Sequence, residues 1–340
     1  MTIKMSKHAK TLQRQQGVAL LVIMLIVALV TVLATEMVTR LQLNLARTVN
    51  IKANNQAYWY AMGAEEFAKK SLRDLRTLNP DTINLNQPWA KLFNYPIDGG
   101  GIQAQVTDMQ ACFNLNSLVT KRTDDGSSNV SSEIKIQTEI QAFNRLLVLT
   151  NSDAIDSFTA DTVSESLADW LDEDSDLRSY GAEDGDYESL QFPYSAANSL
   201  MTNSSEFRLI NGVDVSWLNL VLPYVCVLPN DSTLAVNVNT LEPDHAKVLA
   251  ALTGLSTDAA NRLISARPVD GYKNIADFLS EPELQDLNDT QKAWLTVKSN
   301  YFMLDIKTRY NGASFNMSTL FKVFNTDEVE VMSREFRSIN

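Results

Sequence analysis

The sequence predicts an α+β fold in which one long N-terminal helix packs on a small antiparallel sheet that is interrupted by a large, mostly helical insertion. Three observations predict it. Residues 18–75 contain no proline and follow a helical apolar pattern, and strand-like alternation occurs at 101–113 and again within 300–336. The residues between those strands read mainly as helices. Because strands so far apart in sequence would share one sheet, the helical segment is predicted to be an insertion.

The first part of the long helix has the properties of a membrane span. Residues 18–34 read VALLVIMLIVALVTVLA, and about twenty such helical residues cross the hydrocarbon of a bilayer. The preceding residues include four lysines or arginines and no acid, so the N-terminus is predicted to face the cytoplasm and everything after residue 40 to lie outside it. A cleaved secretory signal is the alternative, but the apolar run is long and continues into an amphipathic helix that ends near Leu75.

The basic leader that ends in Gly17, followed directly by this helix, resembles the type IV prepilin class of proteins. The resemblance implies that a prepilin peptidase cuts between Gly17 and Val18 and methylates the new N-terminus. Most members carry glutamate at the fifth mature position, where this chain has Val22. Because an unpaired charge in hydrocarbon is costly, a subunit without that glutamate could occupy the end of a filament. The alternative is that Val22 is simply another lipid-facing residue.

The head is predicted to contain strands from both ends of the insertion. Alternation of Ile102, Ala104 and Val106 with polar residues indicates a half-buried strand that runs on to Cys112. Three more strands are predicted at 301–310, 313–323 and 329–336, the first two joined by a hairpin turn at 311–312. Cys112 and Cys226 both fall on the non-cytoplasmic side, which favours a disulfide between them at the base of the insertion; two separate buried thiols are the alternative.

An acidic segment at residues 169–188 holds nine acids and one base, Arg178. Asp161 and Ser164 are predicted to cap a helix that precedes it, and the acids then follow in a loop. The EF-hand spacing fails because Leu177 stands where the turn needs glycine. Calcium binding and a solvated acidic loop are both open interpretations. The candidate calcium ligands are Asp172, Asp174, Asp176, Glu183, Asp184, Asp186 and Glu188.

A second helical unit at residues 235–280 resembles helix-hairpin-helix or SAM-like units of some DNA-binding proteins. Its turn at 253–257 contains one glycine and no base, and the whole chain carries a formal charge of −12. Because negative charge is repelled by phosphate, we expect no nucleic-acid binding and assign the unit to protein packing. The chain has two histidines and lacks usable GxSxG, HExxH, P-loop or GxGxxG patterns, so we do not expect an enzyme.

Taken in order, these features resemble the minor pseudopilin K family of bacterial type II secretion. The resemblance spans nearly the whole chain and includes the segments FNLN at 113–116, DWLD at 169–172, PYSAAN at 193–198, and the VNVNT…LISARP unit. It implies a pilin-like core, a single-pass protein of the inner membrane with a periplasmic head at the tip of a pseudopilus, partners among the minor pseudopilins I and J, and bound calcium. The alternatives are a minor pilin of a type IV pilus and a signal-anchored periplasmic enzyme.

The domain organisation that follows has six parts. Residues 1–17 are the leader, 18–39 the transmembrane part of the long helix, and 40–117 the stalk with the first strand. Two helical subdomains come next, at 118–228 with the acidic loop and at 229–298 with the SAM-like unit. Residues 299–340 return to the sheet as its C-terminal strands.

Overall fold

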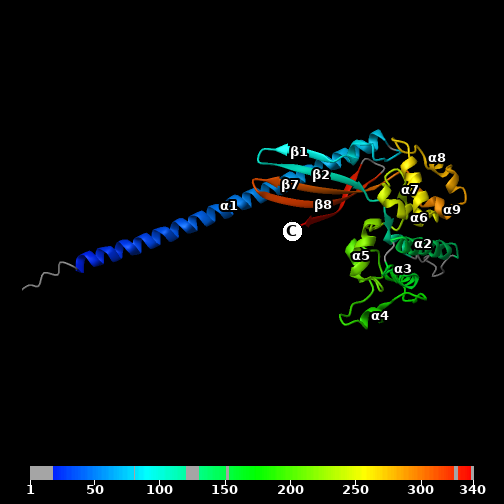
Figure 1. Cartoon of the computed structure of the whole chain (residues 1–340), viewed down its shortest axis with the longest axis horizontal. Helices are drawn as coiled ribbons and strands as arrows, with labels where there is room; N and C mark the ends of the chain where they lie inside the picture. Colours follow the sequence, from blue (N-terminus) through cyan, green and yellow to red (C-terminus); the bar gives the residue numbers. More distant parts are fainter. Residues whose placement is uncertain (1–17, 80, 120–129, 151–152, 325–327, 338–340) are drawn as a thin grey trace, which may run out of the picture.

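The computed structural model describes residues 18–79, 81–119, 130–150, 153–324 and 328–337. Gly17 and the rest of the predicted leader lie outside these residues. A single straight helix projects from a head in which a sheet lies along the helix and a group of shorter helices gathers at the far end (Figure 1). The α+β fold class is therefore as the sequence predicted.

The long helix α1 (Val18–Leu78) comprises 61 residues, close to the predicted 18–75. Its N-terminal part stands free in the described structure, and its side chains begin to be buried at Ala53. Alanines then recur on the buried face, at Ala57, Ala61 and Ala64. Because alanine has almost no side chain, the helix can approach the sheet closely. Among the described residues, none covers the apolar surface upstream of Ala53.

A five-stranded sheet packs on the second half of α1, with strand order β1-β2-β7-β8-β9 and antiparallel neighbours. The three C-terminal strands match the prediction, and Asn311 and Gly312 both have positive φ, as their hairpin requires. A separate apolar core fills the space between α1 and the sheet. The strands are β1 (Phe93–Ile97), β2 (Gly100–Asp108), β7 (Tyr301–Tyr310), β8 (Ala313–Val323) and β9 (Val329–Arg337).

Two strand predictions need correction. The predicted strand at 101–113 ends at Asp108, and Cys112 lies beyond it, directly before a two-residue strand, β3 (Phe113–Asn114), which pairs in parallel with β4 (Val225–Cys226). Strand β1 was not predicted; it contains Pro96, which cannot donate to a ladder. The strand is nevertheless formed since β1 is the edge of the sheet, where one backbone side needs no partner.

The insertion between β2 and β7 is mainly helical, as predicted, and has its own large apolar core. The first predicted subdomain contains a helix that begins at Ser157 with Asp156 as its N-cap, so the expected caps Asp161 and Ser164 lie inside the helix instead. The α-helices of the whole insertion are α2 (Val130–Leu149), α3 (Ser157–Leu171), α4 (Asp184–Glu188), α5 (Val215–Val221), α6 (Ala246–Thr253), α7 (Thr257–Ala266), α8 (Ile275–Leu279) and α9 (Asp289–Ala293). The insertion also contains the short strand pair β5 (Val236–Asn237) and β6 (Leu295–Thr296).

The insertion is joined firmly to the sheet at the point where the chain leaves and re-enters it. Asp108, the last residue of β2, is buried, and its Oδ2 lies 2.6 Å from the Thr240 hydroxyl and also accepts hydrogen bonds from Asn237 and Ser299. Its Oδ1 accepts the backbone N–H of Gln110 at 2.8 Å. Because these partners come from both chain crossings and from the second helical unit, the network fixes the insertion on the end of the sheet.

Candidate functional site

The N-terminal half of α1 carries a long run of exposed large apolar side chains. Among the described residues it is the one helix long and apolar enough to cross a membrane, and its apolar window is fully exposed. Val18 and Val22, the predicted mature N-terminus and its fifth residue, are 56% and 47% exposed. Threonine hydroxyls in this stretch bond back to carbonyls one turn earlier, as Thr35 does to Thr31 at 2.7 Å, so they leave no bare hydroxyl toward lipid. These features fit a single-pass membrane anchor.

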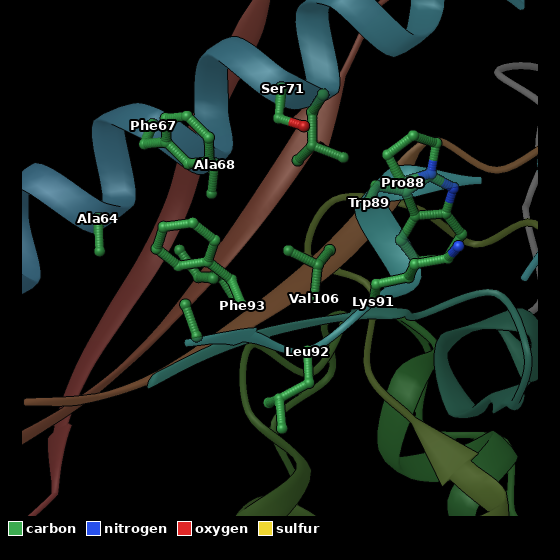
Figure 2. Close-up of a pocket in the computed structure, with 13 residues that line it drawn as sticks. Ala64, Phe67, Ala68, Ser71, Pro88, Trp89, Lys91, Leu92, Phe93 and Val106 are labelled. Atoms are coloured by element: carbon green, nitrogen blue, oxygen red, sulfur yellow. The ribbon is translucent and has the colours of Figure 1, made fainter. Parts of the chain in front are cut away.

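A small apolar pocket lies where α1 meets the sheet edge. It has a volume of about 150 Å³ and is lined by α1 residues such as Phe67 and Ala68 on one side and by Trp89, Phe93 and Val106 on the other. Figure 2 shows the helix side chains facing those of the edge strand across this space. Beside it, the rings of Phe67 and Phe93 stack with centroids 5.2 Å apart. Such a surface suits an apolar protein contact.

The acidic segment folds back onto the end of α3 around Arg178. The guanidinium Nη1 contacts Asp169 Oδ1 and lies 2.7 Å from Asp172 Oδ2. Asp169 is fully buried and its Oδ2 also accepts the backbone N–H of Arg178 at 3.3 Å. The chain passes so close at Gly181 that a Cβ there would lie 1.8 Å from Asp169 Oδ2. The loop therefore depends on glycine at this position.

Three buried carboxylate oxygens in this segment have no hydrogen-bond partner. They are Asp172 Oδ1 and both side-chain oxygens of Glu183, whose side chain is 8% exposed. Burial, reinforced by the negative charges of Asp169, Asp172, Asp184 and Asp174, raises the pKa of Glu183 to about 7. Burial also raises the pKa of Asp172 to about 6, despite its bond to Arg178. The loop thus holds more negative charge than its one arginine balances.

The other five predicted ligands are less buried than Asp172 and Glu183. Asp174 Oδ1 accepts the backbone N–H of Asp176 at 3.0 Å in the loop, and Asp176 is exposed. Asp184 and Asp186 accept backbone N–H groups of Ala196 and Glu183, at 2.8 and 3.1 Å. Glu188 is exposed at the end of α4. Thus, of the seven predicted ligands, Asp172 and Glu183 carry buried oxygens without a hydrogen-bond partner.

Two features of this loop were not predicted from sequence. Asp169 is the most buried carboxylate of the group and was not among the candidate ligands. Arg178 was noted as the one base but given no role. Within the described parts of the chain, no set of three or more His, Cys, Asp or Glu side chains is already arranged around a common metal position.

The predicted disulfide is present. Cys112 and Cys226 are bonded across a sequence separation of 114 residues, beside the short parallel pair β3 and β4. It closes the first part of the insertion at its base, as the sequence suggested. Both sulfurs also lie near the carbonyl oxygen of Met109, which follows β2 directly. The bond therefore ties the start of the insertion to the end of the sheet.

Comparisons with known proteins give a consistent picture. Two family profiles, both described as type II secretion system (T2SS) protein K, match residues 111–230 and 236–298. The type II secretion system protein K of Aeromonas hydrophila is 38% identical over 297 residues, covering 85% of this chain and 87% of that protein. The protein of the same name from Klebsiella pneumoniae is 38% identical over 312 residues, covering 90% and 92%. That from Dickeya chrysanthemi is 33% identical and covers 96% and 99%.

The fold is similar to a solved structure as well. A chain in the crystal structure of the GspK-GspI-GspJ complex from the type 2 secretion system of enterotoxigenic Escherichia coli superposes with a TM-score of 0.74 at 29% identity. The match covers 86% of the present chain and all of that chain.

Proposed function

Since this chain belongs to the type II secretion system protein K family and is thus a minor pseudopilin of type II secretion, we propose that it caps the tip of the pseudopilus and initiates its assembly. The observation that carries the proposal is the position of the insertion. It sits at the end of the head farthest from the start of α1, where a further subunit would have to stack (Figure 1). A broad head at this end leaves the helix free to pack among others below it.

The N-terminal helix supports the same position. We propose that the leader is removed after Gly17 by a prepilin peptidase, that Val18 is then methylated, and that α1 anchors the protein in the inner membrane with its head in the periplasm. Val22 presents an apolar side chain where most related subunits have glutamate. A subunit at the tip has no subunit above it whose N-terminal amine would need that carboxylate, so the apolar residue fits the first place in assembly.

We propose that the direct partners are the minor pseudopilins I and J. The solved complex that this fold resembles contains GspI and GspJ beside GspK. In the present chain, the exposed apolar half of α1 and the pocket beside Phe67 offer surface for such neighbours. Exposed apolar surface of this extent is typical of a protein that functions in an assembly.

We propose further that the acidic loop binds calcium as a structural ion. The donors suit it, because Ca²⁺ prefers six to eight oxygen ligands and tolerates irregular geometry. Asp172 and Glu183 would supply buried oxygens, with Asp174 and Asp184 close by, and Asp176, Asp186 and Glu188 are the more exposed candidates. Bound calcium supplies positive charge where the loop holds excess negative charge, so the loop's return path over Asp169 would be stabilised.

The cap is tested by removing the insertion while keeping the sheet. Asp108 of β2 pairs with Phe302 of β7, so residues 111–299 can be replaced by a short glycine-serine turn that joins neighbouring antiparallel strands. If the insertion blocks further stacking, I and J will still co-purify with this variant. Cells that carry it will form pseudopili of altered length and secrete poorly. The control variant is Val269→Ser, which changes one exposed residue of the insertion and leaves the rest of it in place. Normal pseudopilus length and secretion in the shortened variant would reject the cap.

A further inference from the structure

The acidic loop contains one basic side chain, and this side chain contacts the most buried acids of the loop. Residues 146–207 hold fourteen acids and a single base, Arg178. That base contacts the two most buried carboxylates of the loop, Asp169 and Asp172, which are 0% and 2% exposed. The only cationic side chain in this long acidic stretch is therefore placed between its least hydrated acids.

Arg178 leaves three buried carboxylate oxygens of the acidic loop without a hydrogen bond. Asp172 Oδ1 and both oxygens of Glu183 stay buried without a hydrogen bond, although the first belongs to a carboxylate that Arg178 already holds by its other oxygen. A buried carboxylate oxygen without a partner carries a substantial desolvation cost. A second cation that satisfies Asp172 Oδ1 must approach that carboxylate, and it therefore also approaches the guanidinium that holds the other oxygen.

We infer that Arg178 competes with a divalent cation for Asp172, and that this internal counter-ion sets how tightly the acidic loop binds calcium. The inference rests on the calcium site proposed above. Two cations that share one carboxylate repel each other strongly at the distances of a buried site. Asp169 keeps its backbone N–H bond from Arg178 when the side chain lets go, and the arginine side chain, at 23% exposed, already reaches the surface.

If Arg178 and the divalent cation compete, the loop has a counter-ion whether or not metal is bound. In this structure, Arg178 bridges α3 to the loop and pairs with Asp169 and Asp172. In the loaded protein, the oxygens of Asp172 and Glu183 face the ion and the arginine is no longer required there. The result would be weaker calcium binding than so acidic a loop would otherwise show, and a site that fills only where calcium is plentiful.

The test is a calcium titration of the full-length protein in detergent, with Arg178→Gln compared with Arg208→Gln. Arg208 is exposed, lies in the same insertion and carries the same charge, so its loss controls for net charge. Terbium luminescence sensitised by Trp170, next to Asp169 in the chain, reports occupancy, and calcium competition gives the affinity. We expect Arg178→Gln to tighten calcium binding at least about tenfold, and Arg208→Gln to change it less than about threefold in physiological salt.

Arg178→Lys keeps the charge but lacks the planar fork that reaches two carboxylates, so we expect its calcium affinity to fall between wild type and Arg178→Gln. If Arg178→Gln folds only when calcium is present, the comparison of Arg178→Lys with wild type still tests the competition. Equal affinities for Arg178→Gln and Arg208→Gln, or weaker binding by Arg178→Gln, would overturn the competition while leaving the calcium site intact. Failure of the wild type and every variant to bind calcium or terbium would instead reject the proposed calcium site itself.

Discussion

Arg334 in the last strand forms a two-pronged ion pair with Glu65 in the middle of the long helix. The Arg334 Nε lies 2.8 Å from Glu65 Oε2, and its Nη2 lies 2.8 Å from Oε1. Thr319 of β8 adds a third hydrogen bond to Glu65 Oε2 at 2.8 Å. Glu65 is fully buried, whereas the Arg334 side chain is 39% exposed. The pair therefore binds the C-terminal end of the sheet to α1 through one buried charge.

The two halves of this pair should differ in mutational cost. Arg334→Gln leaves the Glu65 carboxylate buried with only Thr319, so we expect the free energy of unfolding to fall by about 3 kcal/mol. Glu65→Gln leaves an arginine that can turn into water, and we expect a loss of about 1 kcal/mol. Urea denaturation followed by tryptophan fluorescence measures both. Equal losses would show that burial of Glu65 does not control the energy of the pair.

The same pair predicts a pH dependence. Burial alone raises the pKa of Glu65, but hydrogen bonds from Arg334 and Thr319 and the charge of Arg334 outweigh it and leave the pKa below its ordinary value of 4.5. Because the folded pKa is depressed, this stability is present above pH 4.5 and is lost as the pH falls through the folded value. The stability difference between wild type and Arg334→Gln should shrink between pH 5 and pH 3. A constant difference over that range would exclude the linkage.

Removing the disulfide should destabilise the insertion without unfolding the sheet. The bond closes a sequence separation of 114 residues, for which loop entropy predicts roughly 4–5 kcal/mol of stabilisation. We expect Cys112→Ser with Cys226→Ser to lower the melting temperature of the insertion and to increase proteolysis within residues 113–298. The α1–sheet core is a separate apolar cluster, so its fragment should persist in limited proteolysis. Loss of both parts together would show that they unfold as one unit.

Two glycines of the acidic segment form a matched pair. At Gly181 a Cβ would lie 1.8 Å from Asp169 Oδ2, whereas at Gly185 it would meet nothing within 4 Å. We expect Gly181→Ala to cost about 2–3 kcal/mol, because the loop must move away from α3. Gly185→Ala lies in the short helix α4 and should be neutral or stabilise by up to about 1 kcal/mol. Thermal melting of the full-length proteins compares them, and similar melting temperatures would contradict the close approach.

Val22→Glu tests the role of the apolar N-terminus. If this subunit occupies the first place in assembly, a carboxylate at position 22 has no neighbouring amine to pair with in hydrocarbon, and initiation should be impaired. We expect reduced recovery of the complex with I and J and reduced secretion. Val22→Leu keeps the apolar surface and is the control. Unchanged secretion and complex recovery with Val22→Glu would count against the tip position.

Several parts of the structure could be predicted because their signals are local. An unbroken apolar run followed by helical spacing specified α1 to within a few residues of its end, and alternation with an Asn-Gly turn specified β7 and β8. The basic leader predicted that the cysteines lie outside the cytoplasm, which favoured the disulfide that the structure contains. The acidic run located the candidate cation site but not its geometry.

The sequence by itself determined the long helix, the C-terminal strands, the insertion between distant strands and the place of the acidic loop, because the period of apolar residues decides local backbone form and which face is buried. Only the tertiary structure decided that β2 stops at Asp108, that Arg178 stands between Asp169 and Asp172, and that Glu65 meets Arg334 from 269 positions away. These meetings depend on how remote segments pack, since the energy of a charge or polar group is set by its neighbours and its burial rather than by its place in the chain.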